Sequence, residues 1–417
     1  MRNGLKKVNF LNYSILVPYL MLSAIGIVMV FSATVPYQLA RGLSPYRMVI
    51  TQAAFMLLSF VAISIIYRIK LKALKNRGML LFILAILVLA LIAARFIFPP
   101  VNGAHGWIPI PGVGTIQPAE VAKVFIIWYL ASVFSEKQEA IKNHDIQELF
   151  KGQSKVQRWF GGWRLPVVLL LGLDIIMPDM GNALILALLV MVMVGASGIS
   201  WRWFSGYGKM ILTFVFAFIA LLFVTGGEII PAGLKISYVN ARFRAFVNPF
   251  SDLANSGHQL ANSYYAIVNG GWLGRGLGNS IEKNGFLPEA HTDFIFAIVV
   301  EELGVIGGIL ILGILFFLII RILLVGIRAR NPFNSLMTIG IGAMLLIQVF
   351  INVGGAIGII PETGVTFPFL SQGGSSFLVL SLGIGFALNI SADEKRREVS
   401  ELSELSKQYT NFGDKIH

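Results

Sequence analysis

The sequence has 417 residues, of which 56% are hydrophobic and only 13% charged, and its mean hydropathy is +0.76. Soluble domains carry about 25% charged residues, so this composition excludes a soluble enzyme, a secreted domain and a disordered chain. The net charge of +12 does not indicate nucleic-acid binding, because the basic residues lie between hydrophobic segments, as expected for contacts with anionic membrane lipids. The absence of cysteine excludes disulfides and thiolate chemistry.

Long apolar segments predict an all-α polytopic membrane protein, since a membrane-spanning helix needs roughly 20 apolar residues. We predict ten spans, at 12–33, 45–67, 78–98, 117–135, 164–177, 181–199, 207–225, 292–320, 334–358 and 369–391. The fifth and sixth are separated at Pro178-Asp179-Met180-Gly181, because this sequence is unfavourable in the middle of a membrane helix.

The distribution of basic residues predicts the orientation. Of the 33 lysines and arginines, 24 fall in the segments predicted to be cytoplasmic, and the short external loops and their flanks hold only Arg41, Arg47 and Arg95. Both termini are therefore predicted to be cytoplasmic, with a cytoplasmic loop at 136–163 and a large extracellular loop at 226–291. We expect one transmembrane domain over 1–391 and a flexible cytoplasmic tail over 392–417.

Charged residues at the outer ends of the fourth and sixth spans are the first candidates for a polar site. Glu120 and Lys123 lie one helical turn apart on the same face, just after Pro118, and either form a structural ion pair or organise a polar cavity. Asp179 either caps the next helix or joins such a cavity.

The end of the extracellular loop is the segment richest in polar groups. Gln259–Asn269 predicts a short amphipathic helix, and the glycine-rich run Gly270–Ser280 allows sharp turns or the approach of backbone amides to a ligand. Glu289, His291 and Asp293 then follow at the mouth of a helix, where they can bind a substrate or a metal ion. Asp293 has apolar flanks that predict a raised pKa and make it the strongest candidate for a general base, although a simple helix cap is the alternative.

Basic residues of the same loop predict recognition of an anionic headgroup, above all a diphosphate. The candidates are Arg242, Arg244 and Lys283, and a solvated loop surface is the alternative. Ser375 and Ser376, before the tenth span, either contact the substrate or pack between helices.

Four segments, in matching order, resemble the SEDS (shape, elongation, division and sporulation) family of membrane glycosyltransferases over roughly residues 12–392. They are Gln117–Lys123, Pro178–Gly181, Leu287–Phe294 and Asn352–Ser376. Gly106–Gly112, Gly257–Ser263 and the long 136–163 loop are most similar to the division-septum branch of the family. Ala119, Asn182 and Gln372 depart from the family pattern without touching the acidic candidates, whereas Glu362 leaves the role of its own loop open.

The resemblance implies polymerisation of lipid II, an undecaprenyl-diphosphate-linked disaccharide-pentapeptide, at the extracellular face of the cell membrane. It places Asp293 at the position of the family's essential acid, as the base that accepts a proton from the acceptor 4-hydroxyl. A β-1,4 glycan and undecaprenyl diphosphate would be the products, with Arg242, Arg244, Lys283 or Lys123 stabilising the leaving diphosphate. The resemblance also implies septal localisation, a class B penicillin-binding protein as transpeptidase partner, and other divisome proteins. No cofactor is required by the sequence, although Mg or Mn can assist.

Two other functions remain open. A lipid II flippase would need a polar path across the bilayer, and the clustering of acids and bases at the outer ends favours chemistry on one face instead. A polymerase of the elongation branch would carry out the same chemistry in the lateral wall.

Overall fold

A computed structural model describes residues 10–99, 106–110, 114–151, 162–228, 237–255 and 257–413. Some predictions fall on residues outside these ranges. They concern 152–161 in the 136–163 loop, 229–236 and 256 in the 226–291 loop, and the termini at 1–9 and 414–417. The same holds for residues 111 and 112 of the Gly106–Gly112 segment.

The protein is an all-α membrane protein, as predicted, and a helix lies at the position of each of the ten expected spans. They are α1 (Tyr13–Ala40), α2 (Arg47–Arg68), α3 (Arg77–Phe96), α4 (Pro118–Glu136), α8 (Arg164–Ile176), α9 (Met180–Ala196), α10 (Trp201–Val224), α13 (Ile295–Arg328), α14 (Pro332–Ala356) and α15 (Gly374–Gly413). Within the described residues, eight are long and apolar enough to cross a membrane. The others, α8 and α9, are shorter, with 13 and 17 residues, because the chain breaks between them at Pro178.

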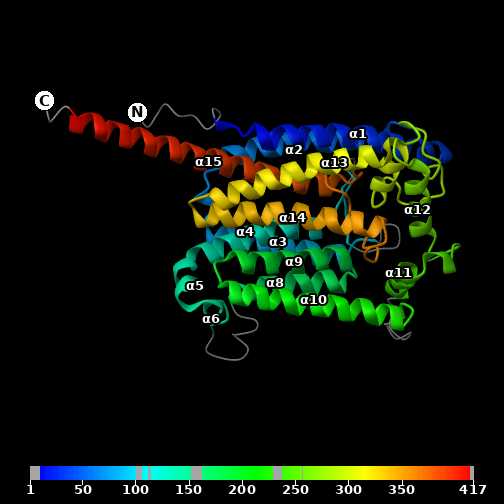
Figure 1. The fold of residues 1–417 in the computed structure, drawn as a ribbon, viewed down its shortest axis with the longest axis horizontal. Helices are drawn as coiled ribbons and strands as arrows, with labels where there is room; N and C mark the ends of the chain where they lie inside the picture. Colours follow the sequence, from blue (N-terminus) through cyan, green and yellow to red (C-terminus); the bar gives the residue numbers. More distant parts are fainter. Residues whose placement is uncertain are drawn as a thin grey trace.

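The helices run side by side, and the connecting elements gather at the two ends of the bundle (Figure 1). One end carries α5 (Gln138–His144) and α6 (Ile146–Leu149), and both the start of α1 and the end of α15 lie on that side. The opposite end carries α11 (Ser237–Val247), η3 (Pro249–Ser251) and α12 (His258–Gly270), so the large loop is partly helical. The amphipathic helix predicted at Gln259–Asn269 is confirmed as α12.

Local sequence explains where several helices begin. Asn12, Asn76 and Asn331 accept hydrogen bonds from the first-turn amides of α1, α3 and α14. Pro118 and Pro332 occupy the first turns of α4 and α14, where a missing N–H costs nothing. The packed interior is formed by α4, α14 and α15. In the most apolar stretch of these helices, 78%, 72% and 83% of the residues are buried, whereas in that of α10 only 7% are buried.

Three features differ from the sequence-based expectation. A short antiparallel hairpin, β1 (Ile108–Ile110) and β2 (Gly114–Ile116), precedes α4, and a 3-10 turn, η2 (Ala73–Lys75), precedes α3. The last helix, predicted to end at 391, continues as α15 to Gly413 and extends beyond the bundle (Figure 1). The tail residue Glu394 explains part of this, because it accepts hydrogen bonds from Arg330 N (3.0 Å) and Asn334 Nδ2 (2.5 Å) at the start of α14.

Candidate functional site

The α12–α13 loop (residues 271–294) is anchored to a break in α13. Gly304 has a φ of 75°, which interrupts the helix and releases backbone groups for other partners. Arg275 N and Gly276 N donate to the carbonyls of Glu301 and Glu302, both at 2.9 Å. The backbone amides of Arg275 and Gly276, both in the glycine-rich run, therefore bind α13 of the same chain. The close backbone approach that this run was predicted to allow is made to this helix.

A buried polar network holds the base of this loop. The Lys283 ammonium donates to Glu302 Oε1 at 2.6 Å, to Ser32 Oγ at 2.8 Å and to the carbonyl of Gly278 at 2.7 Å. The neighbouring carboxylate of Glu301 accepts from Ser280 Oγ and from the amides of Ile281 and Glu282. Lys283 has three acceptors for its three protons, so it is part of the framework and lies outside the group around Asp293.

The segment that carries Asp293 is fixed through its backbone. Asn352 Nδ2 donates to the carbonyls of Asp293 and Val365, both at 2.7 Å. Ser371 Oγ donates to the carbonyl of Thr292 at 2.6 Å, and Gln372 N donates to that of His291 at 2.8 Å. These bonds attach the segment to α14 and to the α14–α15 loop (residues 357–373) and leave the Asp293 carboxyl free to face the site.

Asp293 lies among other charged groups at the end of the bundle that carries α11 and α12. A side-chain carbon added to Gly364 would lie 3.6 Å from Asp293 Oδ2 and 3.5 Å from Arg242 Nη2, so both the carboxyl and the guanidinium lie next to this glycine. Arg242 pairs with Glu362 at 3.7 Å. Burial, followed by the charges of Glu362 and Glu289, raises the pKa of Asp293 to about 8, and Arg242 opposes this rise.

His291 and Glu289 flank the acid and have their own contacts. Thr292 Oγ1 donates to Glu289 Oε2 at 2.7 Å. The His291 ring is buried, 5.3 Å between centroids from Tyr37 of α1, and Arg41 covers the Tyr37 ring. Burial lowers the pKa of His291, the nearby Glu289 opposes this, and the balance disfavours the charged ring.

A second polar cluster lies beside the α14–α15 loop. Lys123 and Glu120 form the predicted ion pair at 2.8 Å, and Asp179 caps α9 by accepting from Asn182 N at 3.1 Å. Gln117 Nε2 donates to Asp179 Oδ2 at 2.7 Å. These contacts confirm the structural alternatives for the two motifs, and they do not test whether the same residues also contact a substrate.

The two clusters meet where the Pro178–Gly181 turn touches the α14–α15 loop. Gly181 approaches this loop so closely that a side-chain carbon would lie 2.6 Å from the carbonyl oxygen of Thr363. The structure adds Asp174 of α8, which is fully buried with no hydrogen-bond partner on either carboxyl oxygen. The sequence signal was present, because a carboxylate inside an apolar span is itself a functional candidate.

Arg244, Ser375 and Ser376, the remaining predicted residues, have contacts of their own. Arg244 pairs with Glu228 at 3.3 Å, with both side chains largely exposed. Ser376 Oγ lies 3.0 Å from Thr366 Oγ1, and Ser375 is buried at the start of α15. Of the predicted basic residues, Arg242 is therefore the one that the structure brings to Asp293, and contact with substrate stays a prediction for all of them.

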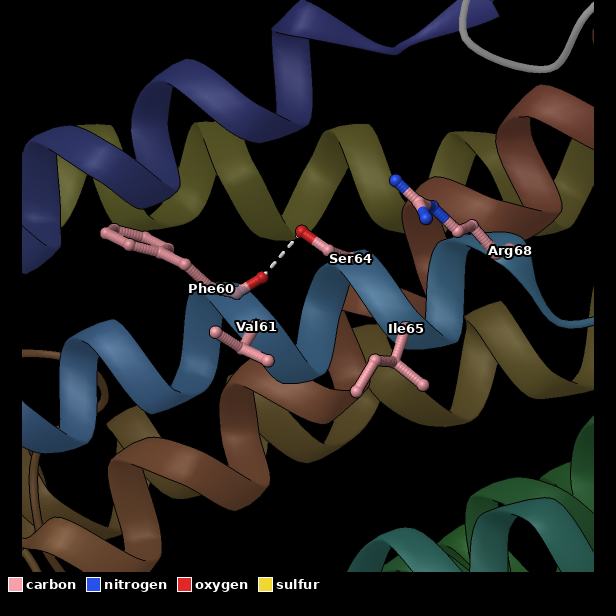
Figure 2. A pocket seen from close by; sticks show the side chains of 5 residues that line it. All are labelled: Phe60, Val61, Ser64, Ile65 and Arg68. Carbon is pink, nitrogen blue, oxygen red and sulfur yellow. Dashed lines mark hydrogen bonds between the residues drawn. The ribbon is translucent and has the colours of Figure 1, made fainter.

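No group of three or more Asp, Glu or His side chains in the described part of the chain is arranged to hold a metal ion. Assistance by Mg or Mn stays a prediction. A groove on the surface of α2 is lined by Phe60, Val61, Ser64, Ile65 and Arg68 (Figure 2), none of which belongs to the group around Asp293. Its hydroxyl is already used, because Ser64 Oγ donates to the carbonyl of Phe60 at 2.8 Å.

The fold and the site together define a polytopic membrane protein with an acid of raised pKa at one end of its helical bundle. The family model described as "Cell cycle protein" (FtsW, RodA and SpoVE) matches residues 13–396. The chain belongs to this family, and the resemblance inferred from its motifs is confirmed.

Individual relatives extend this result. A Lactococcus lactis subsp. lactis (strain IL1403) protein named "Probable peptidoglycan glycosyltransferase FtsW" is 70% identical over 406 residues, covering 96% of this chain and 97% of the relative. A Bacillus subtilis (strain 168) protein of the same name is 36% identical over 402 residues, covering 93% and 92%.

Solved structures show the same fold. A chain from a peptidoglycan synthase complex matches with a TM-score of 0.68 at 23% identity, covering 92% of this chain and 98% of that one. Thermus thermophilus RodA matches with a TM-score of 0.61 at 21% identity, covering 92% and 97%.

Proposed function

We propose that this chain is a peptidoglycan glycosyltransferase that polymerises lipid II at the outer face of the cell membrane. The observation that carries the proposal is the environment of Asp293, a carboxyl with a pKa near 8 beside an arginine at one end of the bundle. A carboxylate with a pKa near the working pH is suited to accept a proton from a sugar hydroxyl. The relatives named FtsW support this activity and favour the division branch over the elongation branch.

The proposed reaction is a single displacement. Asp293 accepts the proton of the acceptor GlcNAc 4-hydroxyl while that oxygen bonds to the anomeric carbon of the donor MurNAc. The bond from this carbon to the diphosphate breaks, the α-linked donor becomes a β-1,4 linkage, and undecaprenyl diphosphate leaves. Arg242 lies close enough to the acid to stabilise the charge that builds on the leaving diphosphate.

The cellular setting is part of the proposal. The solved peptidoglycan synthase complex, whose chain has the same fold, supports a class B penicillin-binding protein as the transpeptidase partner. The FtsW name of the relatives supports action at the division septum with other divisome proteins. The excess of basic residues in the segments predicted to be cytoplasmic supports an extracellular position for Asp293, at the opposite end of the bundle.

The test is polymerisation of labelled lipid II by the purified protein with its penicillin-binding partner, with the products separated on a gel. We expect glycan from the wild type and at least ~100-fold less from Asp293→Asn. Asp252→Asn is the matched control, since it makes the same substitution in the same external region, where Asp252 bonds Asn255 at 3.1 Å. Polymer from Asp293→Asn at the wild-type rate would remove this residue from the mechanism. Absence of polymer from the wild type would favour the flippase.

A further inference from the structure

Large apolar side chains are exposed at the end of α12 and in the α12–α13 loop. They belong to Val268, Trp272, Leu273 and Leu277, with exposed fractions of 76%, 71%, 82% and 54%. We call these four side chains the loop patch. Contact of apolar side chains with water is unfavourable. The loop patch therefore indicates a surface that is covered by another apolar phase in the working protein.

Few charges accompany the loop patch. Over residues 258–288, all of which the structure describes, the Asp, Glu, Lys and Arg side chains are Arg275, Glu282 and Lys283. Glu282 and Lys283 are buried, so Arg275 is the one exposed charged side chain of this stretch. Soluble domains carry about 25% charged residues. The composition is instead typical of a membrane interface, where tryptophan and arginine accompany apolar residues.

The length of α13 sets the height at which the loop patch is attached. The carbonyl of Trp272 accepts a hydrogen bond from Ile306 N at 3.3 Å, next to the break at Gly304. From Gly304 to Arg328, at its predicted cytoplasmic end, α13 rises about 36 Å. The hydrocarbon core of a bilayer is about 30 Å thick. The loop therefore joins α13 near the outer boundary of this core.

Helix α1 gives an independent estimate of the same height. Ser32 of α1 accepts from Lys283 Nζ at 2.8 Å and donates to Glu302 Oε1 at 2.6 Å, so it is level with the base of the loop. Helix α1 begins at Tyr13, at the end of the bundle opposite α12 (Figure 1). From Tyr13 to Ser32 it rises about 29 Å. Both helices place the base of the loop at the outer boundary of the core.

The loop patch also continues a surface that faces lipid. Ile306, Ile309 and Leu310 of α13 are exposed just after the break. Because α13 is long and apolar enough to cross a membrane, these side chains face hydrocarbon. The backbone of Trp272 is bonded to the first of these residues. A tryptophan at the point where a span meets the interface is in its preferred environment.

We propose that the loop patch inserts into the outer leaflet of the membrane and anchors the α12–α13 loop there. Trp272 and Leu273 enter the boundary between headgroups and acyl chains, and the Arg275 guanidinium binds lipid phosphates at headgroup level. A partner protein is the other apolar phase that covers exposed patches. The height of attachment and the single exposed cation favour lipid over such a partner.

The anchor has a consequence for the site. The α12–α13 loop carries Asp293 near its end, and the backbone of the loop is bonded to α13 through Arg275 N and Gly276 N. Insertion of the loop patch would therefore hold the Asp293 segment at the height of the lipid headgroups. The inference uses only the position and composition of the loop, so it holds whichever reaction takes place at Asp293.

Site-directed spin labelling measures the depth of the loop patch. The chain has no cysteine, so one introduced cysteine carries the label without background. We compare Leu273→Cys with Leu402→Cys in the full-length protein, reconstituted into vesicles of phosphatidylcholine and phosphatidylglycerol. Leu402 is the matched control, because it is also an exposed leucine (60%) but lies on α15 after the last predicted span. Ile309→Cys provides the reference for hydrocarbon.

Collision of the label with oxygen, which is enriched in lipid, and with a water-soluble nickel chelate gives the depth. We expect the label at Leu273 to lie about 5–10 Å into the headgroup and acyl boundary. Its oxygen-to-nickel ratio should approach that of Ile309, whereas Leu402 should favour nickel. A ratio at Leu273 equal to that at Leu402 would overturn the proposal. Protection of Leu273 from nickel only after addition of the penicillin-binding partner would also overturn it, in favour of a protein-docking surface.

A second measurement needs no introduced cysteine. Lipids brominated near the headgroup end of their acyl chains quench tryptophan fluorescence at short range. Quenching of the wild type should exceed that of Trp272→Phe, because the exposed ring at 272 lies at this depth. Equal quenching of the two proteins would contradict insertion of Trp272. This comparison decides the proposal if Leu273→Cys does not fold.

Discussion

Two neighbouring regions use charged residues in opposite ways. The base of the α12–α13 loop contains Lys283 and Glu302. The mouth of the site is formed by Arg242 of α11, Glu362 of the α14–α15 loop and Asp293. At the base, Lys283, Glu302 and Ser32 are buried and linked by hydrogen bonds of 2.6 to 2.8 Å. At the mouth, Arg242 and Glu362 are 3.7 Å apart, and the Asp293 carboxyl lies beside them with a raised pKa. The ion pair at the base is short and buried, whereas that at the mouth is longer and partly exposed.

This difference shows which basic residue can take part in chemistry. Sequence reasoning treated Lys283 and Arg242 as equivalent candidates for a diphosphate, because both are cations in the same loop. The structure separates them by burial and by the length of their ion pairs, 2.6 Å for Lys283 with Glu302 and 3.7 Å for Arg242 with Glu362. A buried cation whose protons are all used stabilises the fold, and a partly exposed cation beside an acid of raised pKa is suited to bind a ligand.

Removal of one partner at the base should give the largest effect on stability. Lys283→Met leaves Glu302 buried without its cation, which costs about 3–5 kcal/mol. The midpoint of thermal unfolding in detergent should fall sharply. The double variant Lys283→Met/Glu302→Leu should recover most of this loss, since an apolar pair needs no charge compensation. A single variant as stable as the wild type would show that the network does not hold the loop.

At the mouth, pH should control activity through Asp293. A base must be deprotonated, so the polymerisation rate should rise about tenfold per pH unit below the pKa of about 8 and level off above it. Stability should change in the opposite sense, because a raised carboxyl pKa favours the neutral folded form and this contribution is lost as pH rises through 8. Initial rates and unfolding midpoints between about pH 6 and 9 test both signs. A rate that is flat over this range would contradict the assignment of Asp293 as the base.

The sequence predicted the fold class, the helix order and the raised pKa of Asp293, because these depend on local properties. Ten apolar runs, the break at Pro178 and the apolar flanks of Asp293 are all visible without neighbours in space. The partners of each charge were not visible. Glu302 lies nineteen residues from Lys283, and Ser32 is on another helix, 251 residues away. Only packing decides which cations are saturated.

The same limit explains the residues that were missed. Asn352 supports Asp293 from 59 residues away, and Glu362 reaches Arg242 across the gap between α11 and the α14–α15 loop. Glu362 drew attention in the sequence only because it departs from the family pattern. The tail was expected to end its helix at 391, since its polar composition carries no membrane signal, yet Glu394 extends the packing by capping α14.

Loosening the support of the mouth should cost activity more than stability. Asn352→Leu removes both 2.7 Å bonds to the carbonyls of Asp293 and Val365. Because the Asp293 segment then loses its link to α14, we expect kcat to fall about 10- to 100-fold with a smaller change in KM. Asn389→Leu is the matched control, since Asn389 bonds the carbonyls of Ile66 and Ile69 at the far end of α2. Equal loss of kcat in both variants would point to a general loss of folded protein.

The two arginines of α11 offer the finest test of the mouth. Arg242 and Arg244 are two residues apart, and Arg244 pairs with Glu228, with side chains 48% and 66% exposed. Arg242→Gln should raise the lipid II concentration for half-maximal rate about tenfold, because a charge-assisted contact to the diphosphate is lost. Arg244→Gln should change it less than about twofold, as expected for an exposed surface pair. Initial rates over a range of lipid II concentrations measure both. If Arg244→Gln had the larger effect, the diphosphate would bind further from Asp293 than the geometry of Gly364 indicates.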